Sequence, residues 1–197
     1  VFDADISNII EKEISNKIQI ITNHLVTKAI IKNNKISGVE IKDKNANSQA
    51  KIKTDILIIA AGCRPNISVA KSAGCLIGKT GGIVVNSKSE TSKKNIYAAG
   101  DCTEFIDFVS KRPTCIGLGS IAVRQAIAAG INACGGNYSL PNGVLQTCTS
   151  TFFGHEVSAV GLSDRYLKNY NTVQAKYKGS SLPEYFPGGK KIIIKLT

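Results

Sequence analysis

The sequence predicts an α/β fold that is followed by a shorter α+β segment. Residues 55–62, DILIIAAG, are apolar on both faces, which is typical of a strand in the middle of a sheet that is covered on both sides. Residues 119–133, GSIAVRQAIAAGINA, are rich in alanine and other small residues, which favours a helix that packs closely. After residue 138 the alternation of polar and apolar residues predicts the antiparallel α+β part.

The first part of the chain is predicted to hold a helix and four short strands. Isoleucines recur at helical spacing in residues 3–15, and either Asp3 or Asp5 can cap the open amides of that helix. Turns are expected at Asn33–Asn34 and at 45–49, because asparagine tolerates positive φ. The expected strands are 18–21, 25–32, 35–42 and 50–53.

The middle of the chain is punctuated by proline and glycine. Pro65 ends the strand at 55–62, because proline lacks an amide donor and pushes the preceding residue into extended geometry. Residues 134–143, CGGNYSLPNG, have the composition of a linker. The other expected elements are a short helix at 67–73, strands at 81–86 and 95–100, strand-like stretches in 144–161 and 171–196, and a helix at 163–170.

The composition argues against a membrane protein, a zinc-cluster protein and a disulfide-stabilised protein. No charged-then-apolar leader and no bilayer-length apolar run occur, so we expect a cytoplasmic protein without membrane insertion. The six cysteines are widely spaced, and only two histidines accompany them, so a zinc cluster has no support. Thiols in a reducing cytosol are favoured over a disulfide framework.

The net charge of +11 is spread along the chain. Many of the lysines alternate with isoleucine and valine, as on the solvated face of a sheet. Nucleic-acid binding would call for clustered charge and interleaved aromatic residues, and is the less favoured alternative. A positive field that attracts anionic cofactors or substrates fits the pattern better.

The stretch NIYAAGDC at 95–102 combines an apolar strand with a terminal glycine and a carboxylate. Ligands of open α/β sheets lie beyond the carboxyl ends of the strands. Gly100 lets a ligand approach the backbone, Asp101 can accept hydrogen bonds from sugar or ribitol hydroxyls, and the following amides can face a pyrophosphate. Asp101 as a simple cap of the next segment is the alternative, and the octapeptide alone leaves both open.

Four stretches in fixed order carry a resemblance: TDILIIAAGCRPN, GGIVVN, TSKKNIYAAGDCTE and GLGSIAVRQAIAAGINACGG. With them the chain resembles the C-terminal portion of the FAD-dependent pyridine nucleotide-disulfide oxidoreductases. It is most similar to their NADH oxidase, NADH peroxidase and coenzyme A-disulfide reductase branch. The resemblance implies a flavoprotein homodimer that passes hydride from NAD(P)H to FAD and electrons on to a disulfide, peroxide or oxygen.

The resemblance also implies roles for the two strand ends. Ala61 and Gly62 would end the strand that returns from the NAD(H) domain towards the flavin. Gly100, Asp101 and Cys102 would hold FAD, with the carboxylate on the ribitol and the Cys102 amide near the pyrophosphate.

Two further segments take roles from the same resemblance. Leu118, Gly119 and Ser120 would begin a helix whose N-terminus faces the flavin pyrimidine edge, where partial positive charge stabilises the reduced ring. The alanine face of that helix can equally be ordinary core. Tyr185 would be the catalytic tyrosine of the interface domain, but Phe186 stands where the family has a second tyrosine. A half-buried strand aromatic is the alternative for Tyr185.

The chain departs from the family by what it lacks. Neither Gly-rich nucleotide fingerprint is present, and no cysteine matches the redox-active one. We therefore expect a piece of an enzyme: the second half of an NAD(H)-binding domain at 1–62, the end of an FAD-binding domain at 63–137, and the first part of an interface domain at 138–197. By itself the chain is expected to be inactive, and a non-catalytic fragment or dimerisation module is the alternative function.

Overall fold

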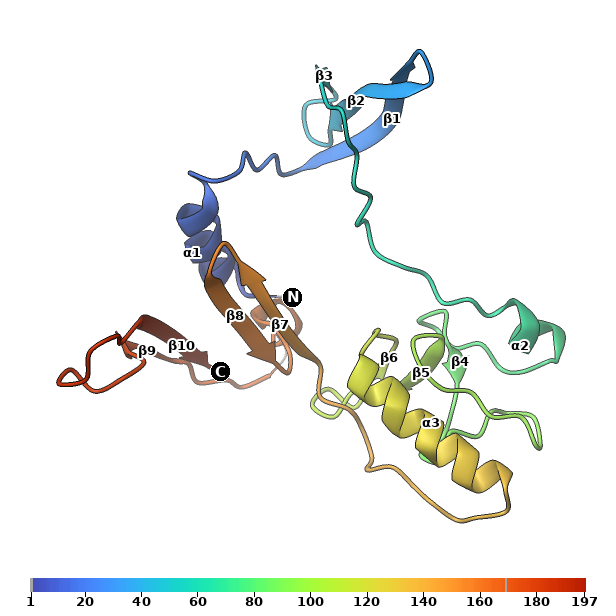
Figure 1. Cartoon of the computed structure of the whole chain (residues 1–197). Helices are drawn as coiled ribbons and strands as arrows, with labels where there is room; N and C mark the ends of the chain where they lie inside the picture. The colour runs from blue at the N-terminus through green and yellow to red at the C-terminus, as the bar shows by residue number, and fades with distance from the viewer. Residues whose placement is uncertain (1, 169) are drawn as a thin grey trace. The chain divides into compact units, whose positions relative to one another are not determined.

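Helix α1 (Ala4–Ile14) forms where the isoleucines recur, and Ile14 on it is buried. The computed structural model of the chain, shown in Figure 1, describes residues 2–168 and 170–197. Those residues divide into two units, one made of 8–65 and the other of 1–7 together with 66–197. Each unit is described by itself below.

The unit of residues 8–65 holds an antiparallel sheet in the order β1-β2-β3, built from β1 (His24–Lys32), β2 (Lys35–Asp43) and β3 (Gln49–Ile52). Asn33 and Asn34 join β1 to β2 with φ of 48° and 58°, as the predicted asparagine turn requires. Val39 and Ile41 are buried, so this small sheet has one apolar face. The strand expected at 18–21 is wrong, because those residues form no strand.

Residues 55–62 correct another prediction. They form no strand, and Ile56, Ile58 and Ile59 are 75%, 84% and 82% exposed. A strand needs a neighbour to receive its amides and carbonyls, and no described strand pairs with this segment. The apolar sequence therefore lies open to solvent instead of lying covered in the middle of a sheet.

The larger unit contains a second three-stranded sheet, in which β4 (Ile83–Val84) runs parallel to β5 (Thr103–Ile106) and β6 (Pro113–Thr114) runs antiparallel to it. The short helix α2 (Ser68–Ser72) lies where it was predicted. Strands β5 and β6 were not predicted. The strand expected at 95–100 is wrong as a strand, since Tyr97 makes only an isolated bridge, to Glu90.

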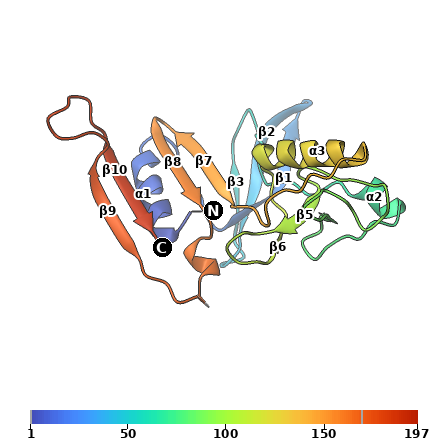
Figure 2. The ribbon, with the colours of Figure 1, turned by 90° about the horizontal axis from the view of Figure 1, so that it is seen from below.

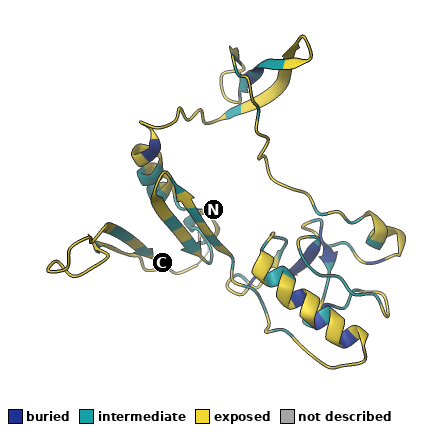
Figure 3. Ribbon diagram, viewed as in Figure 1, coloured by how far each residue is buried: buried dark blue, intermediate teal, exposed yellow. Residues whose placement is uncertain are grey.

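Helix α3 (Gly119–Ala133) has the bounds that were predicted, and it lies along this sheet (Figure 2). Figure 3 shows burial concentrated in β5 and on one face of α3. On that face Ala128 is fully buried, and Gln125 and Asn132 are also buried. The core here is small and partly polar, so hydrogen bonds as well as apolar contacts hold α3 against the rest of this unit.

The last part of the chain forms two antiparallel hairpins, as its alternation predicted. The first joins β7 (Thr147–Phe152) to β8 (His155–Val160), and the second joins β9 (Ala175–Ser180) to β10 (Lys191–Leu196). Between them only a 3₁₀ turn, η1 (Asp164–Tyr166), replaces the helix expected at 163–170. Residue 169 of that expected helix lies outside the described residues.

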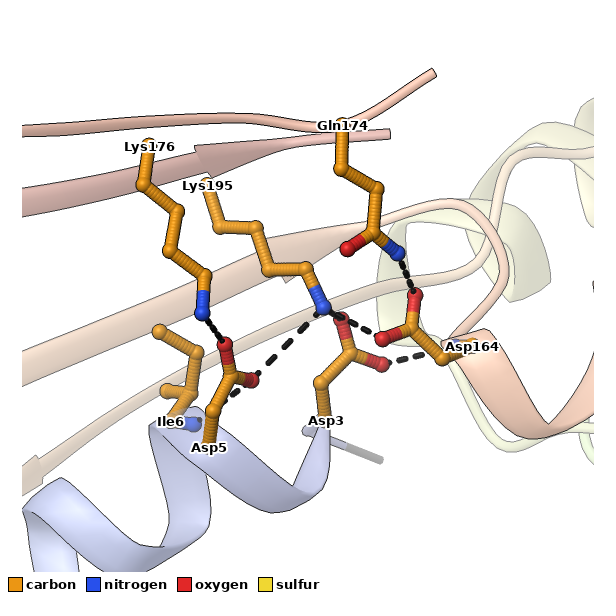
Figure 4. Close-up of polar contacts among 7 residues, drawn as sticks. All are labelled: Asp3, Asp5, Ile6, Asp164, Gln174, Lys176 and Lys195. Carbon is orange, nitrogen blue, oxygen red and sulfur yellow. Dashed lines mark hydrogen bonds and ion pairs between the residues drawn. The ribbon is translucent and has the colours of Figure 1, made fainter. Parts of the chain in front are cut away.

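Lys195 on β10 ties the start of α1 to the second hairpin (Figure 4). Its side chain is 6% exposed, and its Nζ lies 2.8 Å from Asp3 Oδ2 and 3.6 Å from Asp5 Oδ1. Asp164 pairs with the same Nζ, and Lys176 pairs with Asp5. We call these five residues the Lys195 cluster.

The cluster shifts the ionisation of its members. Hydrogen bonds to Asp164 and Asp3 raise the pKa of Lys195 above its ordinary value. Burial alone would raise the pKa of Asp3, but hydrogen bonds from Lys195 and from the Asp164 amide outweigh burial, and the pKa lies below its usual value. The hydrogen bond from Lys176 likewise lowers the pKa of Asp5. Lys195 is therefore stabilised as the ammonium, and Asp3 and Asp5 are stabilised as carboxylates.

Candidate functional site

A tight turn follows the segment 95–100. Gly100 has a φ of +90°, and its carbonyl oxygen accepts a 3.0 Å hydrogen bond from the amide of Thr103. A Cβ atom at Gly100 would meet only Ala122 Cβ, at an ordinary 3.7 Å. The backbone conformation, rather than lack of space, is thus the reason for glycine at this position.

The side chain of Gln125 on α3 contacts both ends of this turn. The Gly100 amide donates to Gln125 Oε1 at 2.8 Å, and the Thr103 hydroxyl lies 3.1 Å from the same oxygen. The Ser89 hydroxyl donates to the backbone carbonyl of Gln125 at 3.0 Å. Ser89 and Thr103 are fully buried, so this polar network is shielded from water.

Asp101 stands at the exposed tip of the turn. Its Oδ2 lies 2.8 Å from the point where a Cβ of Gly117 would stand, which places the carboxylate against the chain just before α3. The Cys115 thiol donates to the Asp101 carbonyl oxygen at 3.5 Å. Among the described residues no group donates a hydrogen bond to the Asp101 carboxylate, so its oxygens can accept bonds from a ligand.

The N-terminus of α3 begins just after Gly117, against which this carboxylate stands. Leu118 has extended geometry, with φ −133° and ψ 111°, and no described side chain caps the helix. The amides of Ile121 and Ala122 donate to the Leu118 carbonyl, whereas those of Gly119 and Ser120 have no described acceptor. The Asp101 carboxylate can accept hydrogen bonds from hydroxyl groups of a ligand. The free amides of the helix can donate to an electron-rich edge of the same ligand.

Residues 1–130 match the family model described as pyridine nucleotide-disulphide oxidoreductase. The chain belongs to the pyridine nucleotide-disulphide oxidoreductase family. This confirms the resemblance drawn from the four ordered stretches.

Individual members of this family resemble the chain over nearly its whole length. An NADH oxidase of Methanocaldococcus jannaschii is 36% identical over 197 residues, and a CoA-dependent NAD(P)H sulfur oxidoreductase of Pyrococcus furiosus is 33% identical over 196 residues. Each alignment covers 98% of this chain but only 42% of the relative. The solved NAD-dependent persulfide reductase from A. fulgidus superposes with a TM-score of 0.89 at 25% identity, covering 98% of this chain and 35% of that one.

Cys102 belongs to the turn, whereas Ala61, Gly62 and Tyr185 come from other parts of the chain. Cys102 is half-buried, with its thiol 3.5 Å from the Ala99 carbonyl oxygen, and its amide has no described acceptor. Ala61 and Gly62 are exposed and belong to the other unit, where Gly62 has a φ of +91°.

Tyr185 lies between β9 and β10 and is 82% exposed. Its ring packs only against Phe186, with 5.1 Å between ring centroids, and no described contact joins it to the turn. The alternative of a half-buried strand aromatic is therefore wrong. Among the described residues no group of three or more histidine, cysteine or acidic side chains could hold a metal ion, and no helix is long and apolar enough to cross a membrane.

Sequence reasoning missed the role of Gln125. A signal was present, because Gln125 and Asn132 are polar residues seven apart on a face of α3 that otherwise carries small residues such as Ala128. A buried amide on such a face must find hydrogen-bond partners, and here the partners lie in the turn and in the loops beside the helix.

Proposed function

We propose that the protein carrying this chain is an FAD-dependent NAD(P)H oxidoreductase. It would pass hydride from NAD(P)H to FAD, and electrons from there to a small-molecule disulfide, peroxide or oxygen. The observation that carries the proposal is the Asp101 carboxylate, which accepts no described hydrogen bond and stands against Gly117, just before the uncapped N-terminus of α3, in a chain of this family.

Each residue of the turn would contact a different part of the cofactor. Asp101 would accept hydrogen bonds from ribitol hydroxyls, and the amide of Cys102 would donate to the pyrophosphate. Gly100 supplies the positive φ that the turn requires, and the ligand would lie beside its backbone. FAD, when bound, supplies the two-electron carrier between nicotinamide and acceptor.

The start of α3 has a separate task. The amides of Gly119 and Ser120, after Leu118, would direct partial positive charge at the flavin pyrimidine edge and favour the reduced ring. Ala61 and Gly62 would end the strand that leads from the NAD(H) part to the flavin part.

The division into domains follows the same proposal. Residues 1–62 would be the second half of the NAD(H)-binding domain, 63–137 the end of the FAD-binding domain and 138–197 the first part of an interface domain. That last part has two hairpins that can pair with a twin, which supports a homodimer. The thiols of Cys75 and Cys102 fit a reducing, cytoplasmic location.

The acceptor is left as a class. The relatives named above are called NADH oxidase, sulfur oxidoreductase and persulfide reductase, which supports oxygen or a sulfur compound as the acceptor. Tyr185 remains the proposed catalytic residue of the interface domain, and Phe186 beside it limits that segment to one phenol.

The alternative is a non-catalytic fragment or dimerisation module. It is favoured by the absence of both Gly-rich fingerprints from the sequence and by the exposed isoleucines 56, 58 and 59. Under both functions, residues 1–197 alone should be colourless and inactive with FAD and NADH, so flavin binding by the whole protein discriminates between them. Only an oxidoreductase would bind flavin stoichiometrically once the additional segments of its relatives are present.

The proposal is tested in the whole protein with Asp101→Ala. Loss of a charge-assisted hydrogen bond costs about 1.5–3 kcal/mol, so the variant should lose FAD during dialysis that the wild type survives. Glu156→Ala, which removes an exposed carboxylate on β8, is the matched control and should retain FAD. Equal retention by Asp101→Ala and wild type would show that the carboxylate does not hold the flavin.

A further inference from the structure

We propose that Gln125 is a positioning residue, which fixes the Gly100–Thr103 turn so that Asp101 presents its carboxylate to the ribitol of FAD. This inference rests on the proposed function. It concerns a residue that makes no contact with the cofactor itself and acts only through the turn.

One oxygen atom holds both ends of the turn. Gln125 Oε1 accepts from the Gly100 amide at 2.8 Å, and the Thr103 hydroxyl lies 3.1 Å from it. Asp101 lies between these two residues in the chain. Its backbone therefore cannot rotate without breaking at least one of the two contacts.

Gln125 is itself held in place. Its side chain is almost wholly buried, at 3% exposure for the residue, and its backbone carbonyl accepts the hydrogen bond from Ser89. The Thr103 hydroxyl also lies 2.8 Å from the Gly100 carbonyl oxygen, which closes the network upon the turn. A buried hydrogen-bond network of this kind rigidifies what it contacts.

The same helix offers a comparison. Asn132 is buried to a similar degree, at 6% exposure, and its side chain donates to the carbonyls of Lys88 and Tyr138 and accepts from the Tyr138 amide. It anchors α3 to neighbouring loops, but none of its hydrogen bonds reaches the Gly100–Thr103 turn. Any effect that comes only from loosening the helix should appear with either residue.

The experiment compares Gln125→Met with Asn132→Leu in the whole protein. Both replace a buried amide by an apolar group of similar size, and both are expected to lower the melting temperature of the apoprotein. Gln125→Met should weaken FAD binding about tenfold or more, since the Gly100 amide loses its acceptor, while Asn132→Leu should change the dissociation constant by less than about twofold. Gln125→Glu keeps an acceptor and should recover most of the affinity.

A double-mutant cycle separates positioning from general loosening. If Gln125 acts through Asp101, Gln125→Met should add little to the loss of affinity that Asp101→Ala already causes. Full additivity, or equal loss of FAD from Gln125→Met and Asn132→Leu, would overturn the inference. If Gln125→Met does not fold, Thr103→Val, which removes one of the two contacts, takes its place in the same cycle. A wild-type protein that holds no FAD would overturn the proposed function and this inference with it.

Discussion

The Oδ2 atom of Asp101 lies 2.8 Å from the position that a Cβ atom of Gly117 would occupy. Gly117 does not have the positive φ that favours glycine, so what a side chain there would disturb is the neighbouring Asp101 carboxylate and not the backbone. Any side chain at this position would push against the carboxylate. The direction of the Asp101 side chain thus depends on a residue sixteen positions away.

Gly117→Ala should therefore weaken FAD retention without unfolding the protein. The Asp101 side chain is exposed and can rotate away from the new methyl group, so the melting temperature should change little. A displaced carboxylate loses its bond to the ligand, and we expect about a tenfold loss of affinity for FAD. Equilibrium dialysis with flavin fluorescence measures it.

The control for that variant is Gly130→Ala on α3. Nothing lies within 4 Å of a Cβ at Gly130, and alanine is favoured over glycine in a helix by about 0.5–1 kcal/mol. It should leave the affinity unchanged and raise the melting temperature slightly. Unaltered FAD binding in Gly117→Ala would mean that the observed direction of the Asp101 carboxylate is not needed.

Lys195→Met should destabilise the protein by about 1–3 kcal/mol, because the nearly buried ammonium neutralises carboxylates that would then face one another. Lys191→Met on the same strand, where the side chain is exposed, should cost less than about 0.5 kcal/mol. Denaturant unfolding gives both values. A Lys195→Met variant as stable as Lys191→Met would contradict a stabilising role for the cluster.

The Lys195 cluster also predicts how stability depends on pH. The folded-state pKa values of Asp3 and Asp5 lie below the ordinary 3.8, so the stability they give is present above that pH and is lost as pH falls through the folded values. The pKa of Lys195 lies above its ordinary 10.5, so its contribution is present below that pH and is lost as pH rises through the folded value.

Unfolding measured from below pH 3.8 to above pH 10.5 tests this dependence. Asp3→Asn should flatten the acid side, and Lys195→Met should flatten the alkaline side. Curves for the two variants that run parallel to that of the wild type would place the pH dependence elsewhere in the protein.

The turn between β1 and β2 predicts a stabilising change. Asn33 and Asn34 both have positive φ, and asparagine followed by glycine is the preferred pair for such a turn. Asn34→Gly should stabilise the unit of residues 8–65 by up to about 1 kcal/mol, and Asn34→Val should destabilise it. Amide hydrogen exchange in β1 and β2 reports on this unit separately, and slower exchange in Asn34→Val would refute the assignment of the turn.

Local signals in the sequence were sufficient for elements that are stabilised locally. Helix α3 and the Asn33–Asn34 turn formed where propensity and spacing placed them. The strand at 55–62 did not form, because its predicted place requires neighbouring strands that the described residues do not provide. Propensity reports how well a segment fits a sheet, not whether a partner strand is there.

The site was predicted in part for the same reason. Gly100 and Asp101 were singled out because a glycine followed by a carboxylate is a local pattern, although they lie in a turn and not at the end of a strand. Gln125 was missed as its partner, and so was the pairing of Lys195 with Asp3, since both contacts join residues far apart in the chain. No periodicity or spacing encodes such contacts, which depend on the completed fold.

The contact between Asp3 and Lys195 spans 192 residues, and this separation sets an order of events during synthesis. At about 5–20 residues per second, a ribosome needs roughly 10–40 s to add Lys195 after Asp3. For that time the first turn of α1 carries carboxylates that have not met their lysine. The growing chain must therefore tolerate these unpaired carboxylates, and the anchoring of α1 can be completed only after β10 has been made.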